Sequence, residues 1–219
     1  MIKVSVVDDH KLFRESLVML LESFDDIEVV YQANDGKEFF ELLAIYEDRK
    51  PDIILLDIQM PRMNGFEVCE KLIEEYPGVK IIIVSQLTTR ESIHKVMDLG
   101  AHGFFTKNSD PEELEEIIKS INGHEFYLGR DLHWALKELL ENGDKTEMPL
   151  HSTLSDREID IIKLAAKEMN SIQIADELSI HARTVDTHKK RIMEKTNSKN
   201  FVGAIVYALR NGFFTLTDI

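Results

Sequence analysis

The first 123 residues repeat one pattern five times: a short run of β-branched and apolar residues, then a stretch with helical periodicity. Several runs are apolar at every position, as strands are when helices cover both faces of their sheet. Strands that alternate with helices form a parallel, doubly wound sheet, so an α/β fold is predicted. The strands are expected at Ile2–Val7, Glu28–Tyr31, Ile53–Leu56, Lys80–Val84 and Gly103–Thr106, and the helices near 11–23, 36–46, 65–75, 90–99 and 111–122.

The C-terminal part of the chain has only helical periodicity. Ser155 and Glu158 have the spacing of a capping box, and Asn170 and Gln173 repeat it. An all-α unit of four helices is therefore predicted. The helices are expected from Ser155 to about Lys167, from Asn170 to Leu178, from about Arg183 to Lys195 and from about Phe201 to Arg210. The second and third, joined by a short turn, have the size of a helix-turn-helix.

Two domains follow from this division, at residues 1–123 and 151–219. The segment 124–150 between them is predicted to be a linker with a short helix at 130–141. Its last part, NGDKTEMP at 142–149, is polar and contains glycine and proline, which break regular structure.

Charge is divided unequally between the two parts. Residues 1–148 hold 16 basic and 31 acidic residues, a balance of −15, whereas residues 149–219 hold 10 and 9, a balance of +1. The window 183–199 is basic, which is typical of DNA binding but equally of a solvated helix face. Cys69 is the only cysteine and no apolar run could span a bilayer, so we expect a reduced, cytoplasmic protein without membrane contact.

Polar side chains follow four of the five predicted strands. Asp8 and Asp9 follow the first, Asp57 the third, Ser85 the fourth and Lys107 the fifth. In an open parallel sheet, ligands bind at the carboxyl ends of the strands. Clustered carboxylates repel one another unless a cation neutralises them, and oxygen ligands suit Mg²⁺. Each residue alone is more often a turn or surface residue, but the joint pattern predicts a site for Mg²⁺ and phosphate.

The segments that carry these residues resemble the receiver domain of response regulators, over about residues 1–123. They are VVDDH at 6–10, LLDIQMPRMNGFE at 55–67, IVSQ at 83–86 and GFFTK at 103–107. The resemblance implies a (βα)5 flavodoxin-like fold in which Asp57 is the phosphoacceptor. It also implies that Asp9, Asp57 and the backbone carbonyl of Gln59 hold Mg²⁺, with Asp8 acting through water.

The same resemblance assigns roles to the far side of the pocket. Lys107 would pair with the acyl phosphate, Ser85 would bind a phosphoryl oxygen, and Phe104 would rotate inward as Ser85 moves. Two residues depart from the family pattern. Gln86 stands where receivers usually have a small residue, and it would narrow access to Asp57. Leu87 cannot orient an attacking water, so slow loss of the phosphoryl group is expected.

The C-terminal part resembles the DNA-binding domain of LuxR-type regulators, over about residues 150–213. The matching segments are LSDREIDII at 154–162, IQIADEL at 172–178 and RTVDTHKKRIMEKT at 183–196. A receiver followed by this domain is the architecture of NarL/FixJ response regulators. The resemblance places His188 on the inner side of the recognition helix. It implies DNA contacts at Arg183, base-facing positions at Asp186, Thr187 and Lys190, and mostly phosphate contacts at Thr184, Lys189 and Arg191.

The sequence therefore predicts a two-component response regulator and not an enzyme with turnover, although the receiver assists its own phosphorylation and dephosphorylation. Phosphorylation at Asp57 would control dimerisation and sequence-specific DNA binding. The implied partners are a sensor histidine kinase, an operator with paired half-sites, a second copy of the chain and RNA polymerase. Two alternatives remain open: a DNA binder that does not depend on phosphorylation, and an interaction module that has lost DNA binding.

Overall fold

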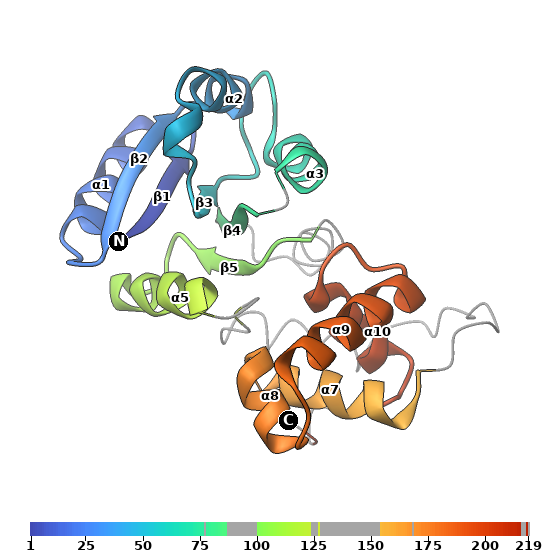
Figure 1. Cartoon of the computed structure of the whole chain (residues 1–219). Coiled ribbons are helices and arrows are strands. Elements are labelled where there is room, and N and C mark those ends of the chain that lie inside the picture. The colour runs from blue at the N-terminus through green and yellow to red at the C-terminus, as the bar shows by residue number, and fades with distance from the viewer. Residues whose placement is uncertain are drawn as a thin grey trace.

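The computed structural model describes residues 1–76, 78–86, 100–123, 127, 154–167, 169–215 and 218 (Figure 1). The predicted helix at 90–99, the residue Leu87 and the linker, apart from residue 127, lie outside the described residues. Those expectations therefore stay predictions. No helix within the described part is long and apolar enough to cross a membrane.

The N-terminal domain is built on a five-stranded parallel sheet in the order β2-β1-β3-β4-β5. The strands are β1 (Ile2–Val7), β2 (Ile27–Ala33), β3 (Ile53–Leu56), β4 (Lys80–Ser85) and β5 (Gly103–Thr106). The described helices are α1 (Lys11–Glu22), α2 (Gly36–Ile45), α3 (Gly65–Glu75) and α5 (Pro111–Gly123), with a 3-10 turn at η1 (Glu47–Arg49). The α/β prediction is thus confirmed.

The sheet is buried on both faces, because successive side chains of a strand point to opposite sides. Ile53 and Leu55 of β3 belong to the core formed with α1 and α5, whereas Ile54 and Leu56 belong to the core formed with α2 and α3. All four side chains of β3 are therefore buried. β4 ends one residue later than predicted, and the edge strand β2 departs most from its predicted range, because the exposed Gln32 interrupts its apolar run before the strand ends.

The C-terminal domain contains four described helices around a small apolar core. They are α7 (Asp156–Ala166), α8 (Ser171–Glu177), α9 (Ala182–Thr196) and α10 (Phe201–Arg210). Both predicted capping boxes are present, with Ser155 paired to Glu158 and Asn170 paired to Gln173. Each box satisfies backbone N–H groups that a helix start leaves without partners. The four-helix prediction is confirmed, and α8 and α9 form the helix-turn-helix.

The two domains meet where the segment before β5 contacts the loop between α9 and α10. The Asn200 side chain accepts a hydrogen bond from the Gly203 N–H at 2.9 Å, which caps α10. Its amide nitrogen donates to the backbone carbonyl of Ala101 at 2.8 Å. Gly100, next to this contact, has φ +92°, a backbone conformation that favours glycine. One side chain thus serves both domains.

His102, at the start of β5, uses its ring to complete the sheet. Its backbone N–H donates to the Ile81 carbonyl at 2.7 Å, and its Nδ1 accepts from the Ile81 N–H at 3.1 Å. Burial lowers the pKa of His102 to about 4, and the neighbouring Lys80 charge acts in the same direction. The ring is therefore neutral at pH 7, as an acceptor must be.

We expect the free energy of unfolding to fall as the pH is lowered from 6.5 toward 4. In that range the unfolded chain binds a proton at His102 that the folded chain does not, which costs about 3 kcal/mol at most. His102→Gln keeps an acceptor for Ile81 but does not titrate, so it should lose less stability. Urea unfolding at about pH 7.5 and about pH 4.5 compares the two chains, and equal losses in both would contradict this role.

Candidate functional site

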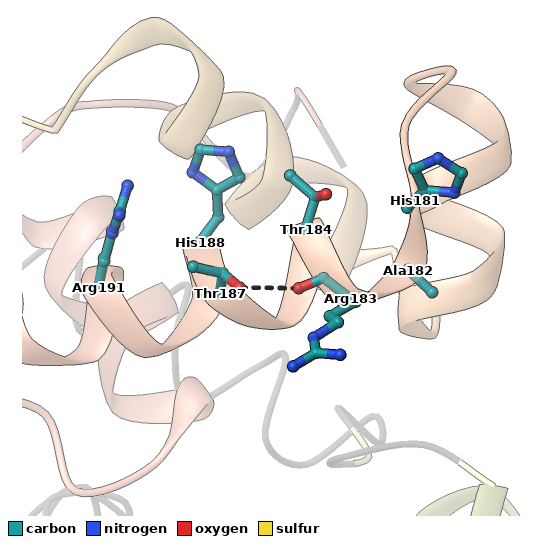
Figure 2. A pocket seen from close by; sticks show the side chains of 7 residues that line it. All are labelled: His181, Ala182, Arg183, Thr184, Thr187, His188 and Arg191. Carbon is teal, nitrogen blue, oxygen red and sulfur yellow. Dashed lines mark hydrogen bonds between the residues drawn. The ribbon is translucent and has the colours of Figure 1, made fainter.

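Helix α9 presents a polar, basic surface. Arg183, Thr184 and Thr187 lie exposed on it, as do Lys190 and Arg191, whereas Val185 and Ile192 are fully buried. The first part of α9 borders an open hollow (Figure 2). The residues that line the hollow are His181, Ala182, Arg183, Thr184, Thr187, His188 and Arg191. Two guanidinium groups and two imidazoles along one helix suit an anionic ligand.

Contacts with α7 and α8 fix the position of α9. The Arg157 guanidinium donates to the Leu178 carbonyl at 2.8 Å, which ties α7 to the end of α8. Glu158 is buried, and its carboxylate accepts from Lys195 Nζ at 2.7 Å. Burial raises the pKa of Glu158, but the Lys195 and Ser155 hydrogen bonds outweigh it, so the net shift is downward. Lys195 therefore stabilises the domain through this ion pair, although 38% of its side chain is exposed.

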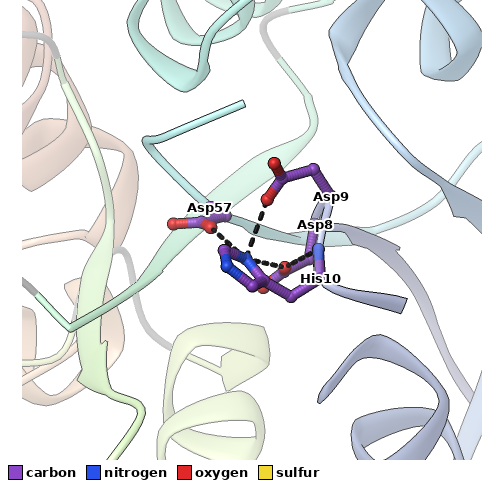
Figure 3. A group of neighbouring side chains, drawn as sticks. All are labelled: Asp8, Asp9, His10 and Asp57. Carbon is purple, nitrogen blue, oxygen red and sulfur yellow. Dashed lines mark hydrogen bonds and ion pairs between the residues drawn. The ribbon is translucent and has the colours of Figure 1, made fainter. Parts of the chain in front are cut away.

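The second site lies at the carboxyl edge of the sheet, where Asp8, Asp9 and Asp57 converge as predicted (Figure 3). Asp8 is 1% exposed and Asp57 is 4% exposed. Their backbones are held by strand-type hydrogen bonds, from Asp8 N–H to the Ala33 carbonyl and from Asp57 N–H to the Val7 carbonyl. The sheet itself therefore forces these carboxylates together.

Lys107 joins the two buried carboxylates. Its Nζ lies 2.6 Å from Asp8 Oδ2 and 2.9 Å from Asp57 Oδ2, and only 5% of its side chain is exposed. Burial alone would lower the pKa of Lys107, but the bonds to Asp8 and Asp57 outweigh it and the net shift is upward. The ammonium is therefore charged at neutral pH and offsets part of the negative charge.

The Lys107 charge does not fully compensate Asp57. Burial raises the pKa of Asp57, and the charge of Asp8 adds to this, against the opposing hydrogen bond and charge of Lys107. Its ionised form is thus less stable than that of a free aspartate, which a divalent cation beside it would reverse. Three carboxylates with ligand atoms close together provide the hard oxygen donors that Mg²⁺ prefers, so the residues fit this ion.

The loop after Asp57 returns to the backbone of Asp57 and Ile58 and leaves no room for a side chain at Gly65. A Cβ on Gly65 would lie 2.3 Å from the Asp57 carbonyl oxygen, and the Gly65 N–H donates to the Ile58 carbonyl at 3.0 Å. Arg62, with φ +62°, forms an ion pair with the buried Asp35 at the start of α2. These contacts fix the backbone around Gln59, whose N–H lies 3.4 Å from Asp57 Oδ1.

Comparison with known proteins identifies both domains. The profile of the "Response regulator receiver domain" matches residues 4–119, and that of "Bacterial regulatory proteins, luxR family" matches residues 152–208. The transcriptional regulatory protein DegU of Brevibacillus brevis is 32% identical, over 97% of this chain and 94% of its own length. The chain belongs to the NarL/FixJ family of response regulators. A receiver and a LuxR-type DNA-binding domain thus make up this response regulator, and its family regulates transcription.

Solved structures share its architecture. The response regulator ChrA of a heme-sensing two-component system is 28% identical, with a TM-score of 0.52 over 97% of this chain and 98% of that one. RcsB from Salmonella enterica serovar Typhimurium, bound to promoter rprA with the phosphomimetic BeF₃⁻, has a TM-score of 0.56. RcsB is 20% identical and covers 94% of this chain and 98% of its own, so it shows the fold alone.

The remaining receiver residues occupy the expected parts of the response regulator. Ser85 ends β4 and is 1% exposed, and its carbonyl accepts from the Lys107 N–H at 3.0 Å. Phe104 lies in β5 and is 5% exposed, and its rotation on phosphorylation stays a prediction. Gln86 is exposed at the end of β4.

Two expectations for the recognition helix need correction. Lys189 was expected to contact DNA phosphate, but it is 3% exposed, with Nζ 3.0 Å from Ser171 Oγ and 5.3 Å from the centre of the Phe201 ring. The long stem of a lysine can pack against apolar neighbours, and sequence spacing did not reveal that it points inward here. His188 was expected on the inner side, but it lines the open hollow and is partly exposed.

Sequence reasoning gave His10 no role, although it follows Asp8 and Asp9 directly. Its Nδ1 lies 2.8 Å from Asp9 Oδ1, 3.4 Å from Asp8 Oδ1 and 3.9 Å from Asp57 Oδ2. The signal was present in the sequence as an imidazole beside an acid pair. The structure adds the direction of the imidazole: His10 is the N-cap of α1, and its ring points toward the carboxylates (Figure 3).

We expect Lys189→Ala to lower the free energy of unfolding of the C-terminal domain by about 2 kcal/mol. The change removes a buried stem and a charged hydrogen bond to Ser171, whereas Lys190→Ala changes an exposed position and should cost less than about 0.5 kcal/mol. The neighbouring lysine is the matched control. Thermal and urea unfolding of the full chain measure both, and equal stability of the two variants would contradict the buried role.

Proposed function

We propose that Asp57 accepts a phosphoryl group from a sensor histidine kinase in a Mg²⁺-dependent reaction, and that this modification controls dimerisation and DNA binding. The observation that carries the proposal is the pocket itself: Asp57 is buried and lies 2.9 Å from Lys107 Nζ, which also bonds the second buried carboxylate, Asp8. A turn or cap aspartate would have no need of a buried lysine partner.

The chemistry is a displacement at phosphorus. An Asp57 carboxylate oxygen forms the new P–O bond while the P–N bond to the donor histidine breaks, and the imidazole keeps the electron pair and takes up a proton. Bound Mg²⁺, held by Asp9, Asp57 and the Gln59 carbonyl with Asp8 acting through water, would supply positive charge beside the transferred oxygens. Lys107 Nζ, 2.9 Å from Asp57 Oδ2, would add a second positive group and orient the acyl phosphate.

The phosphorylated Asp57 carries more negative charge and more acceptor oxygens than the free carboxylate. The Ser85 hydroxyl would donate to one of these oxygens, and Lys107 would move from Asp8 toward the phosphate. A shift of this kind at β4 and β5 would alter the face of the receiver next to Phe104 and so bias two conformations. The partner kinase donates the phosphoryl group, and two phosphorylated chains form the dimer.

We expect beryllofluoride with Mg²⁺ to shift the wild-type chain toward dimer and to raise its affinity for operator DNA. Asp57→Asn removes the anionic oxygen to which the mimic binds, so neither effect should occur. Sedimentation velocity and DNA binding are measured on the same samples. Dimerisation of Asp57→Asn with the mimic would disprove the phosphoacceptor assignment. Unchanged DNA affinity of the wild type would favour a DNA binder that does not depend on phosphorylation.

We further propose that the exposed face of α9 enters the major groove of paired half-sites. Asp186, Thr187 and Lys190 would face the bases, and Arg183, Thr184 and Arg191 would contact phosphates or groove edges. The exposure of these side chains supports this assignment, and the burial of Lys189 removes that residue from it. An α-helix fits the major groove, and residues in its N-terminal half reach base edges.

Replacement of Lys190 and Arg191 should separate base reading from phosphate binding. Lys190→Ala should lose about 1–3 kcal/mol of discrimination at one base position in each half-site. Arg191→Ala should weaken binding to all sequences alike and reduce the salt slope by about one. Binding-site selection and salt titrations of the dimer measure these effects. Identical motifs from Lys190→Ala and wild type would rule out base reading by Lys190, and no motif with wild type would favour the interaction-module alternative.

A further inference from the structure

We propose that His10 is a nitrogen ligand of the receiver's metal site, so that this site takes first-row transition-metal ions such as Mn²⁺ and Zn²⁺ in addition to Mg²⁺. The inference rests on the proposed function, because it concerns the same pocket. It changes the chemistry of the site from oxygen ligands alone to a mixed set of oxygen and nitrogen, and it makes His10 a determinant of metal selectivity.

The geometry brings four ligand atoms to one place. One carboxylate oxygen each from Asp8, Asp9 and Asp57 and a ring nitrogen of His10 all lie within 4.8 Å of one another. Ligands at about 2.0–2.2 Å from one metal ion lie no more than about 4.4 Å apart, so small rotations of the side chains would bring His10, Asp9 and Asp57 into contact with one ion, with Asp8 acting through water. Figure 3 shows the imidazole among the three carboxylates.

The backbone of His10 is fixed, while its ring is not committed to the helix. His10 is the N-cap of α1, a position where Ser, Thr, Asp or Asn usually bonds the first turn, yet its side chain makes no cap bond. Its N–H donates to Asp8 Oδ1 at 2.8 Å, and its carbonyl accepts from the Arg14 N–H at 3.0 Å. With 67% of its side chain exposed, the ring can rotate about a fixed anchor.

Lys107 does not compete for this position. The lysine Nζ bonds the Oδ2 atoms of Asp8 and Asp57, whereas His10 Nδ1 lies nearest to the Oδ1 atoms of Asp9 and Asp8 and is 3.9 Å from Asp57 Oδ2. A metal ion on the His10 side would therefore leave the contact of Lys107 with Asp8 in place and share the Asp57 carboxylate with Lys107. It would also lie beside the solvent-exposed Asp9, where it can keep waters and meet a phosphoryl group.

The ligand atoms of the site determine which metal ions bind more tightly when His10 takes part. Carboxylate and carbonyl oxygens suit Mg²⁺ and Mn²⁺, whereas an imidazole favours Zn²⁺ and other ions later in the first row. Mg²⁺ gains little from a nitrogen ligand, so removal of His10 should affect its binding least. The ratio of Zn²⁺ affinity to Mg²⁺ affinity is thus the quantity that His10 should raise.

The test uses the full-length chain, Mn²⁺ as the probe and the variants His10→Asn, His188→Asn and Asp57→Asn. Pulsed electron paramagnetic resonance of bound Mn²⁺ should show a nitrogen-14 coupling from imidazole in wild type and in His188→Asn, the matched control. The coupling should be absent in His10→Asn, which keeps a good N-cap residue. Release of bound Mn²⁺ by added Zn²⁺ or Mg²⁺ then gives the relative affinities.

In His10→Asn the site should bind Zn²⁺ at least about tenfold more weakly, since loss of even an outer partner of a metal ligand costs that much. Mg²⁺ affinity should change little. Mn²⁺ that binds to wild type without a nitrogen coupling, or a Zn²⁺ to Mg²⁺ ratio that His10→Asn leaves unchanged, would overturn the inference and leave the proposed function intact. Failure of wild type to bind either Mn²⁺ or Mg²⁺, or equal binding by Asp57→Asn, would overturn both.

Discussion

Repulsion between carboxylates at one edge of the sheet is the constraint on which the receiver depends. The parallel register of β1 and β3 brings Asp8 and Asp57 to the same edge, and both are buried there. Two buried negative charges without a partner would favour protonation or unfolding. Lys107 at the end of β5 supplies one compensating charge, and the pocket supplies oxygen donors for a second. Any change in charge at Asp57 therefore changes the electrostatic force on Lys107, which directly follows β5.

The surrounding backbone turns this electrostatic arrangement into a defined geometry. Gly65 lets α3 begin against the carbonyl of Asp57, and the ion pair of Arg62 with Asp35 ties the intervening loop to α2. The carbonyl of Gln59 lies in this restrained loop, so the backbone ligand proposed for Mg²⁺ would be positioned before the ion binds. The pocket thus combines side chains from β1, β3 and β5 with one backbone segment.

Much of this arrangement could be predicted from the sequence, and the exceptions have physical reasons. Strands buried on both faces have a strong apolar signal, and β1, β3 and β5 have the predicted bounds. The edge strand β2 has a weaker one because Gln32 faces solvent. The prediction for Lys189 was wrong because helical spacing does not show which residues of other helices lie beside a side chain. Here Ser171 and Phe201 lie beside the Lys189 ammonium. His10 was overlooked because the sequence does not show toward which neighbours its ring points.

At Asn200, a single side-chain hydrogen bond joins the two domains. Its oxygen caps α10 and its nitrogen bonds the Ala101 carbonyl, so the two ends of one amide belong to different folding units. An aspartate there would differ by a single atom, and it would keep the cap while losing the bridge. A change of this codon from asparagine to aspartate would therefore alter the contact between the receiver and the DNA-binding domain without lowering the stability of either domain. Response regulators of this kind can thus diverge at this contact with little loss of domain stability.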